Sequence, residues 1–600
     1  MKILTGFLMI ITFCATAQVD QAKLGNEYFQ KGELQKAEEI YQELYKNPAA
    51  LPLIYSNYLD LLLRSEEHKS AESLIKSAQK YFPSNTQYQV GLLKLYEVSS
   101  QTDEQDKYLK KLRKEYGDNN FALANLAKYM ANQQLNEFAI DFYKEAREIS
   151  RTSYAYALEL AALYRAEDMR DSMMDEYLNY ASINTHGLAY VKNLFQSILQ
   201  DEQDQNFLEQ TLIRRMQDNP SDMMYPDLII WLEIQRKNFY SAFIQARAMD
   251  KRMNKPGEKC LSVARIAMEN EDWDTAILIF EYVIKNYADS RNYPSARTLS
   301  IQARENKVKK TYPVDKQAIR ILSEEYQQLY DELGSNPYTL EAIRSKALLH
   351  AFYLDEIDSA ISKLNFVVSN RRSPPNLISR SKLDLGDIYL LSNEPWESTL
   401  LYSQVEKSDK SSPVGYEAKL RNAKLNYYTG NFALAKDHLD ILKMATTKEI
   451  ANDAIALSLL IQNNTVFDTT DLIMQKYANI ELLVFQNRKS QAIDQFVEML
   501  QNYPDHSLVD EVHWQLSKLN LEMGNFQKSI DHLDQIINNF FDDVLADDAQ
   551  YQKGVILADY LHDDEKALKV LIDFLKKHPG SLFSAEARSR VRVLRGDEIN

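Results

Sequence analysis

Small and apolar residues recur along the chain in the pattern of amphipathic helices that come in pairs. Near the amino terminus, Gly25 and Tyr28 are followed by Gly32, and then by Ala37 and Tyr41. Spacings of three or four residues place side chains on one face of a helix, and a glycine between two such stretches marks a helix end. The pattern predicts two helices joined by a tight turn at Gly32.

This pattern returns at a constant interval. The spacing from Ala37 to Ala71 equals the spacing from Ala242 to Ala276, and Ala139 lies two further such intervals after Ala71. A fixed period of roughly 34 residues is typical of arrays in which each repeat is one helical hairpin. Small residues at these positions allow two helix axes to cross at about 8–10 Å, so we expect stacked hairpins with one continuous core.

The repeat unit resembles the tetratricopeptide repeat, which has Leu-Gly-x-x-Tyr on its first helix and Ala-x-x-x-aromatic on its second. Residues 24–44 match this pattern almost completely, and the turn returns at Gly430 and Gly524, each followed by Asn and Phe. The resemblance covers most of residues 20–580. It implies an all-α fold, an α-solenoid in the form of a right-handed superhelix of tandem tetratricopeptide-type hairpins.

Some units depart from the pattern. Gln105 and Met173 stand where the third and fifth units should have alanine, and residues 188–222 predict two helices without small residues. The later units are longer and close with Pro504 and Pro579. In spacing and closing residues they resemble the repeats of outer-membrane assembly lipoproteins and periplasmic cell-division coordinators.

The period is interrupted twice. The interval from Ala276 to Ala360 exceeds two repeats, which predicts a long pair of helices, and the interval from Ala435 to Ala492 lies between one repeat and two, which predicts one unpaired helix near 450–462. The expected organisation is a cleaved signal peptide (1–17), an N-terminal array (18–290), an irregular long helical pair (291–345), a middle array (346–445), irregular helices (446–488), a C-terminal array (489–579), and a capping helix with tail (580–600).

The amino-terminal segment has the features of a secretory signal. Lys2 precedes an apolar stretch over 3–13, and Ala-Thr-Ala at 15–17 fits signal peptidase, which predicts a mature chain beginning at Gln18. Cys14 follows a phenylalanine, whereas lipid-modified cysteines normally follow a small residue. No later stretch reaches the ~20 apolar residues of a membrane-spanning helix. We therefore expect an exported protein, periplasmic or associated with the outer membrane, with no membrane span in the mature chain.

Composition supports an array of helices. Gly and Pro number 15 each in 600 residues, well under half of the average usage of about 12%. Folds rich in tight turns and phosphate-binding loops need many more glycines. The formal net charge of -16 repels phosphate backbones, so nucleic acid is an unexpected partner. Cys260 is the one cysteine left after cleavage, so packing alone must hold the fold together.

The chain has no motif that predicts catalysis, a metal or a cofactor, so we expect a protein that is not an enzyme. Four groups of residues are candidate sites: His506 and His513 for zinc, Asp542, Asp543, Asp547 and Asp548 for calcium, Cys260 as a reactive thiol, and the basic run Lys307, Lys309 and Lys310. The favoured interpretations are packing or surface histidines, acidic residues at a helix start, a buried inert thiol, and a solvated basic helix end.

The resemblance places a binding surface on the concave face, where exposed positions of each first helix line a groove. Carried over unit by unit, this predicts a partner-binding groove at Asn26, Phe29, Gln30, Lys424, Tyr427, Tyr428, Trp514, Lys518 and Leu521. Aromatic and basic residues on one face suit peptides or helices. Packing of these aromatic side chains between repeats is the alternative.

We therefore expect a protein–protein interaction scaffold of the bacterial cell envelope that binds peptide or helical segments of envelope proteins. An alternative is a glycan-binding outer-membrane protein of the starch-binding type, which uses the same repeats. Such proteins usually have a lipid-attachment signal and several sugar-stacking tryptophans, whereas this chain has four tryptophans and a poor lipidation signal. An enzyme would need a domain of ~100 residues free of the helical pattern, and the sequence has none.

Overall fold

A computed structural model describes residues 18–183, 185–199, 202–444, 448–465 and 471–596. Every regular element in these ranges is a helix. The chain divides into two compact units, one up to Leu232 and one from Glu233, and this boundary lies inside the range expected for the N-terminal array. The predicted signal peptide, 1–17, lies outside the described residues.

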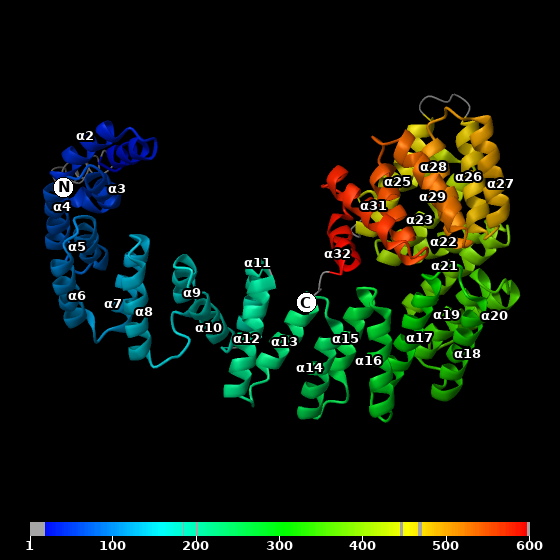
Figure 1. Cartoon of the computed structure of the whole chain (residues 1–600), viewed down its shortest axis with the longest axis horizontal. Coiled ribbons are helices and arrows are strands. Elements are labelled where there is room, and N and C mark those ends of the chain that lie inside the picture. The colour runs from blue at the N-terminus through cyan, green and yellow to red at the C-terminus, as the bar shows by residue number, and fades with distance from the viewer. Residues whose placement is uncertain (1–17, 184, 200–201, 445–447, 466–470, 597–600) are drawn as a thin grey trace, which may run out of the picture. The chain divides into compact units, whose positions relative to one another are not determined.

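The elements of the first unit are drawn in blue to cyan in Figure 1. They are a helix over 18–30, α2 (Leu34–Tyr45), the short 3-10 helix η1 (Pro48–Ala50), α3 (Leu51–Arg64), α4 (His68–Tyr81), α5 (Thr86–Val98), α6 (Thr102–Tyr116), α7 (Asn120–Asn132), α8 (Asn136–Ser150), α9 (Ala157–Ala166), α10 (Arg170–Ala181), α11 (Thr185–Ile198) and α12 (Glu202–Asp218). Helix α13 (Met224–Gln235) spans the boundary between the units.

The second unit continues in green to red along the same figure. Its helices are α14 (Phe239–Arg252), α15 (Glu258–Glu269), α16 (Trp273–Asn286), α17 (Tyr293–Lys309), α18 (Lys316–Leu333), α19 (Pro337–Phe352), α20 (Ile357–Ser369), α21 (Pro375–Leu391), α22 (Pro395–Ser408), α23 (Pro413–Tyr428), α24 (Phe432–Leu442), α25 (Lys448–Thr465), α26 (Leu472–Phe485), α27 (Lys489–Asn502), α28 (Val509–Glu522), α29 (Phe526–Asn539), α30 (Leu545–Asp559), α31 (Asp564–Lys577) and α32 (Ser584–Arg595).

Each hairpin is held by a close crossing of its two helices. A Cβ atom added at Gly25 would lie 2.9 Å from the ring of Tyr41, and one added at Gly386 would lie 2.4 Å from the ring of Tyr402. In both hairpins the first helix supplies a glycine, and the second supplies a buried tyrosine at the same distance along the chain. Tyr41 also lies 5.4 Å from the ring of Tyr58 in the next hairpin. The predicted solenoid of tetratricopeptide-type hairpins is confirmed.

The turns inside the hairpins recur at a constant spacing, although the residue types at these turns differ. Residues with positive φ occur at Gly32, Glu66, Ser100, Gln134 and Asp168, and the interval between neighbours in this series is always one repeat. A left-handed residue after a first helix lets the chain reverse and start the second helix. The period of the turns therefore persists through the degenerate repeats in the amino-terminal half of the chain. Only one of these five residues is a glycine.

The side chains that replace alanine in the degenerate units remain buried. Gln105 is 8% exposed, and its Nε2 donates a hydrogen bond to the Leu93 carbonyl at 3.2 Å. Met173 is 5% exposed. A long polar side chain is accepted at this crossing because its amide finds a backbone acceptor, which removes most of the cost of burial.

The two interruptions of the period have different structures. At the first interruption, helices α17 and α18 contact each other and have 17 and 18 residues. Helix α25 occupies the second interruption and packs mainly on α24, whereas α26 packs on α23 and pairs with α27. Helix α25 is therefore an insertion between two hairpins, and the hairpin after it still contacts the hairpin before it.

Unit 2 curls back on itself through contacts between distant segments. The rings of Phe352 and Phe485 lie 6.4 Å apart, and Asn487 donates a hydrogen bond to the Phe352 carbonyl at 3.4 Å. The hydroxyl of Tyr560 donates to the Lys310 carbonyl at 3.3 Å. These contacts join the carboxyl end of α19 to that of α26, and the carboxyl end of α17 to that of α30. At the end of the array, α32 buries Ala587 and Val591 and exposes Arg588, Arg592 and Arg595, whereas Arg590 pairs with Asp559 at 3.0 Å.

Candidate functional site

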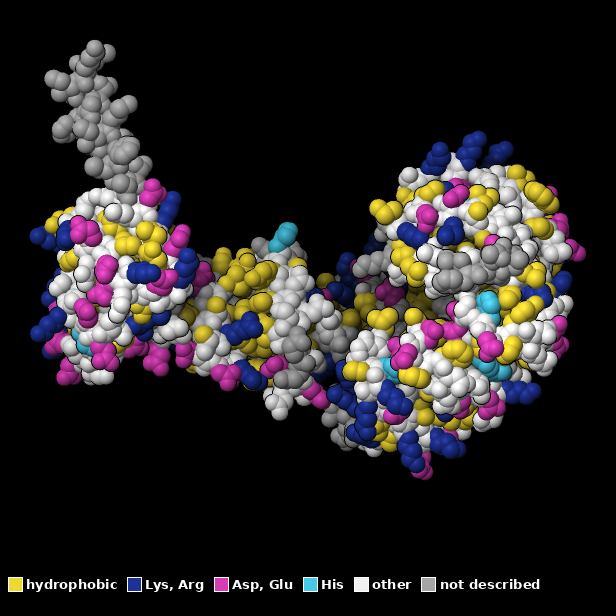
Figure 2. Space-filling view, turned by 90° about the horizontal axis from the view of Figure 1, so that it is seen from above, with side chains coloured by type: hydrophobic (Ala, Val, Ile, Leu, Met, Phe, Trp, Pro, Cys, Tyr) yellow, Lys and Arg dark blue, Asp and Glu magenta, His cyan; other side chains and the backbone are white. Residues whose placement is uncertain are grey.

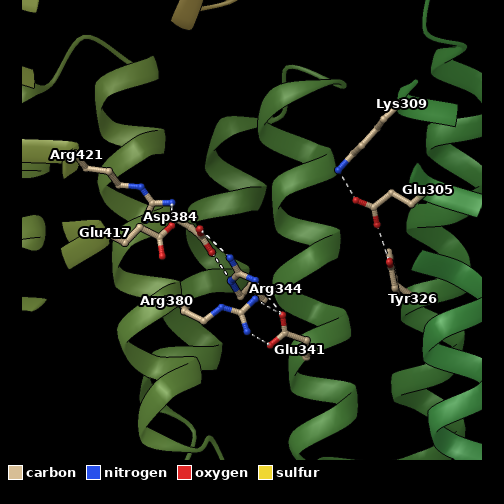
Figure 3. Close-up of polar contacts among 9 residues, drawn as sticks. All are labelled: Glu305, Lys309, Tyr326, Glu341, Arg344, Arg380, Asp384, Glu417 and Arg421. Carbon is tan, nitrogen blue, oxygen red and sulfur yellow. Dashed lines mark hydrogen bonds and ion pairs between the residues drawn. The ribbon is translucent and has the colours of Figure 1, made fainter. Parts of the chain in front are cut away.

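The first helices of unit 2 present two surfaces with different electrostatics. On the first surface, formed by α19, α21 and α23, charged side chains pair with one another (Figure 3). Arg344 contacts Asp384 through two nitrogens, one of them at 3.0 Å, and contacts Glu341 at 2.9 Å. Arg380 also binds Glu341 at 2.9 Å.

The network continues on α23, where Arg421 pairs with Glu417 at 2.9 Å and lies 3.4 Å from Asp387. Asp387 also accepts a hydrogen bond from Tyr402 at 2.6 Å, and burial raises the pKa of Asp387 to about 6. Each charged side chain of this network has a partner within the protein, so the network offers little to a ligand and is better explained as a structural clamp between hairpins.

The second surface contains a pocket of about 790 Å³, the size of many ligand sites. We call it the α25 pocket. One wall is the apolar side of the inserted helix, with Ile455 and Leu459 exposed to the pocket. The opposite wall consists of side chains from α23, α26 and α28, and Val544 and Leu545 complete the rim. The insertion thus converts an open surface of first helices into a pocket.

Glu481 of α26 lies at the centre of the wall opposite α25. Its carboxylate accepts a hydrogen bond from the Tyr427 hydroxyl at 2.5 Å and one from the Gln515 amide at 2.7 Å. Burial raises the pKa of Glu481, and the hydrogen bond from Tyr427 opposes this effect. Three helices, α23, α26 and α28, are joined through this one carboxylate.

Two further carboxylates enter the pocket from the first turn of α28. Asp510 is 3% exposed, and the Oε2 atom of its neighbour Glu511 is buried without a hydrogen-bond partner among the described residues. Burial, reinforced by the nearby Asp510, raises the pKa of Glu511 to about 9. Two adjacent acidic groups in a desolvated place disfavour ionisation of both, so the raised pKa of Glu511 favours its protonated form.

Five of the nine residues predicted for the groove line this pocket: Lys424, Tyr427, Tyr428, Trp514 and Lys518. The amino group of Lys518 lies 5.2 Å from the centre of the Trp514 ring, a cation–π contact, and Lys424 pairs with Asp453 of α25 at 3.3 Å. Whether they bind a partner stays a prediction.

The other four predicted groove residues lie elsewhere. Leu521 is 8% exposed and belongs to an apolar core, so it is not available to a ligand, because its side of α28 packs against the next hairpin. Asn26 accepts hydrogen bonds from Tyr41 at 2.7 Å and from Asn57 at 2.8 Å. Phe29 is half-buried beneath the guanidinium of Arg64, and Gln30 is exposed. In the first unit, then, Asn26 acts as a link between hairpins.

Sequence reasoning missed the carboxylates of the α25 pocket and the wall that α25 supplies. Within its repeat, Glu481 aligns with a groove position of the other repeats. The insertion of α25 lengthens the interval between repeats, so this alignment is not evident from the sequence. Asp510 and Glu511 stand at the start of a helix, where acidic residues are common for reasons of the helix dipole. The sequence does show several acidic residues on the first helices that follow the second interruption, and these could have indicated the site.

The isolated residues considered from the sequence have structural surroundings. Cys260 is fully buried, and burial together with the nearby Asp250 carboxylate raises the pKa of its thiol. The Nδ1 of His506 accepts a hydrogen bond from the Leu508 amide at 3.1 Å. His513 lies against His532, with 3.0 Å between their Nδ1 atoms, and burial lowers the pKa of both.

The two charged runs also lie at helix ends. Lys307 and Lys309 are in the last turn of α17, and Lys310 pairs with Glu271 at 2.6 Å. Asp547 and Asp548 lie in the first turn of α30, as the helix dipole favours. The three lysines lie at the end of α17 and two of the four aspartates, Asp547 and Asp548, lie at the start of α30, whereas Asp542 and Asp543 precede that helix.

A second cavity of about 700 Å³ lies among α22, α23 and α24. Among its lining residues, Glu406 pairs with Lys419 at 2.6 Å and accepts a hydrogen bond from Asn422 at 3.0 Å. Burial lowers the pKa of His438, which also lines this cavity.

Across the described ranges, no helix combines the length and apolarity needed to cross a bilayer.

Comparison with known proteins finds similarity in architecture only. No protein-family model and no curated protein sequence matches the chain. Among solved structures, a tetratricopeptide repeat protein from Parabacteroides merdae shares 11% identity over 52% of this chain and 98% of its own, with a TM-score of 0.27.

Two complexes also contain similar chains. The structure of Naa15/Naa10 bound to HypK matches over 92% of this chain and 96% of that chain, at 10% identity and a TM-score of 0.27. The hetero-tetramer of Cut9 and Hcn1 from the APC/C matches over 89% of this chain and 96% of that chain, at 11% identity and a TM-score of 0.26. At these TM-scores, the argument for the fold rests on the hairpin geometry of the chain itself.

Proposed function

We propose that this tetratricopeptide-type solenoid is a protein-interaction scaffold that binds a peptide or helical segment of its partner in the α25 pocket. One observation carries the proposal. The pocket combines an apolar wall, aromatic side chains and carboxylates without an ion pair among the described residues, whereas the neighbouring surface of α19, α21 and α23 pairs its own charges. An apolar wall with a few convergent polar groups is typical of binding sites.

Trp514 is the side chain with the largest expected effect on binding. It is half-buried in the pocket, and tryptophans in such positions dominate binding energies. We expect Trp514→Ala to weaken binding of peptides selected against the mature chain by 10-fold or more, which corresponds to ~1.4 kcal/mol. Isothermal titration with a selected peptide measures this change.

Trp396→Ala provides the matched control. Trp396 is 85% exposed on the second helix α22 and does not line the α25 pocket, so its replacement should leave affinity within about twofold. Circular dichroism of both variants checks that the fold is kept. Equal affinities for wild type and Trp514→Ala would contradict the proposed site.

We also propose that the scaffold acts in the bacterial envelope, on the basis of the predicted signal over 1–17 and the late-repeat resemblance. The expected result is a periplasmic or outer-membrane fraction that contains a chain beginning at Gln18, as found by amino-terminal sequencing. Crosslinking in intact cells should then recover envelope proteins at a benzoylphenylalanine placed at Leu459. A chain found in the cytoplasm with Met1 intact would contradict this location.

The glycan-binding alternative has less support. Among the residues that line the α25 pocket, Trp514 is the one tryptophan, and the Lys518 amino group lies over its ring. The exposed Trp396 lies on α22, and Trp231 and Trp273 are half-buried. Sugar-stacking sites use exposed ring faces, so a glycan array is expected to show no binding.

A further inference from the structure

The chemistry of the α25 pocket indicates which residue type of a partner it would recognise. Three of its carboxylates, Glu481, Asp510 and Glu511, have no ion pair with a basic side chain among the described residues. Asp510 is almost fully buried, and one oxygen of Glu511 is buried without a hydrogen-bond partner in the same part of the chain. Burying an uncompensated carboxylate costs free energy, so a site of this kind gains when a cation enters.

The two lysines of the pocket compensate these carboxylates only weakly. Lys424 is already paired with Asp453 at 3.3 Å. The Lys518 amino group lies over the Trp514 ring, and although its charge lowers the pKa of Glu481, burial outweighs that effect. The pocket therefore holds desolvated carboxyl groups that form no ion pair with a described basic side chain, and the raised pKa of Glu511 favours a proton there in the free protein.

The rest of the protein surface provides a contrast. On the face shown in Figure 2, Lys and Arg side chains lie scattered among Asp and Glu side chains. The arginines of the α19–α23 surface are likewise paired with acidic residues, as with Arg344 and Arg421. The buried Asp384 and Asp387 of the α19–α23 surface already have a cation from the chain itself, whereas the α25 pocket has room for one from a partner.

A bare metal ion is a poor candidate for that cation. Within the described part of the chain, no three His, Cys, Asp or Glu side chains are grouped closely enough to hold a metal. A long side chain with a charged end fits better, because its apolar stem can lie along Ile455 and Leu459 while its head reaches the carboxylates. The ring of Tyr428 adds a face that attracts ammonium and guanidinium groups, whereas the Trp514 ring already has the Lys518 amino group over it.

We propose that the α25 pocket takes a lysine or arginine side chain of the bound segment, flanked in that segment by apolar residues that pack on α25. This proposal rests on the proposed function, because it names the chemistry of the segment that the pocket binds. The cationic head lies among Glu481, Asp510 and Glu511, and the flanking residues cover Ile455, Leu459 and Val544.

Binding is then linked to loss of a proton. Glu511 is protonated in the free protein below its raised pKa of about 9, and a cation binds its ionised form more tightly. Affinity therefore rises with pH between 7 and 9, by up to 10-fold per pH unit. The other charged groups around Glu511 come from every neighbouring element: Lys424 of α23, Asp453 of α25, Glu481 of α26, Asp510 and Lys518 of α28, Asp543 before α30 and Asp548 within it.

The test begins with a random peptide library displayed on phage and panned against the mature chain. The expected consensus is a lysine or arginine between leucine, isoleucine or phenylalanine residues. Replacing that lysine by norleucine in a synthetic peptide keeps the stem and removes the charge, and we expect affinity to fall at least 10-fold. This measurement needs no change in the protein, so misfolding of a variant does not affect it.

Protein variants then locate the effect. Glu511→Gln has nearly the shape of the protonated side chain, so the fold should be kept. It should weaken an arginine-containing peptide about 10-fold at pH 8.5 and abolish the rise in affinity between pH 7 and 9. Glu565→Gln, at a carboxylate whose side chain is 81% exposed on α31, should change neither.

The outcomes separate the two proposals. Peptides that depend on Trp514 but show no enrichment of basic residues, or that bind equally well with norleucine, would overturn this inference and leave the proposed function standing. A library that yields no peptide sensitive to Trp514→Ala would overturn the proposed function, and the present inference with it.

Discussion

Replacing Asp384 by alanine is expected to lower the free energy of unfolding of the surrounding repeats by roughly 3–5 kcal/mol. The Asp384 side chain is 3% exposed and forms two contacts with Arg344, which is itself 13% exposed. Without Asp384, the guanidinium would retain Glu341 as a partner but would stay buried with uncompensated charge. Removing one member of a buried ion pair is far more damaging than removing both.

Urea denaturation of the full mature chain, followed by hydrogen exchange of peptides from α19 and α21, measures the effect where it occurs. Asp440→Ala is the matched control, because its pair with Lys443, at 2.7 Å, is exposed and should contribute between 0 and ~1 kcal/mol. The double variant Arg344→Leu/Asp384→Leu should recover most of the loss. A loss below ~1 kcal/mol for Asp384→Ala, the range of exposed pairs, would show that the pair is solvated.

The second large effect is expected at the helix crossing of the same hairpin. Gly386→Val places a Cβ 2.4 Å from the Tyr402 ring, and the ring has little freedom to move. Tyr402 is 1% exposed, and its hydroxyl donates to Asp387 at 2.6 Å. Overpacking of this kind typically costs up to ~3 kcal/mol, and helix propensity gains less than ~1 kcal/mol from replacing glycine.

We therefore expect a net loss of about 2–3 kcal/mol for Gly386→Val, seen as earlier urea unfolding and faster exchange in α21 and α22. Gly580→Val provides the control, since a Cβ at Gly580 would have no neighbour within 4 Å. The double variant Gly386→Val/Tyr402→Ala should regain part of the loss if the two side chains clash. An unchanged urea midpoint would mean that the two helices separate at little cost.

The sequence predicts this crossing better than it predicts the turns. Gly25 with Tyr41 and Gly386 with Tyr402 have the same spacing, so a first-helix glycine and a later aromatic residue identify a hairpin wherever both are present. The turn residues Glu66, Ser100 and Gln134 have no such signal. Each adopts positive φ because helix packing on both sides requires the reversal there.

At the candidate site, too, the sequence predicts some residues and tertiary packing decides the others. Repeat positions alone named Tyr427 and Trp514, which the structure brings to one pocket. They also named Leu521, which is buried in the core, because a position on a helix surface does not say what the neighbouring hairpin covers. Glu481 and Glu511 are candidate binding residues because burial raises the pKa of each carboxyl group and both line the same pocket. A pattern of residues along the chain shows neither burial nor spatial neighbours.

By itself, the sequence of this protein determined an array of helical hairpins, because small residues must recur wherever two helix axes cross closely, and such a requirement leaves a period. Only the tertiary structure decided where the array can bind. The course of α25 across α23, α26 and α28, the burial of Asp510 in the pocket that Glu481 and Glu511 also line, and the clamp that pairs Arg344 with Asp384 depend on distances between segments far apart in the chain. Desolvation and ion pairing act through space, and therefore no local pattern of residues specifies them.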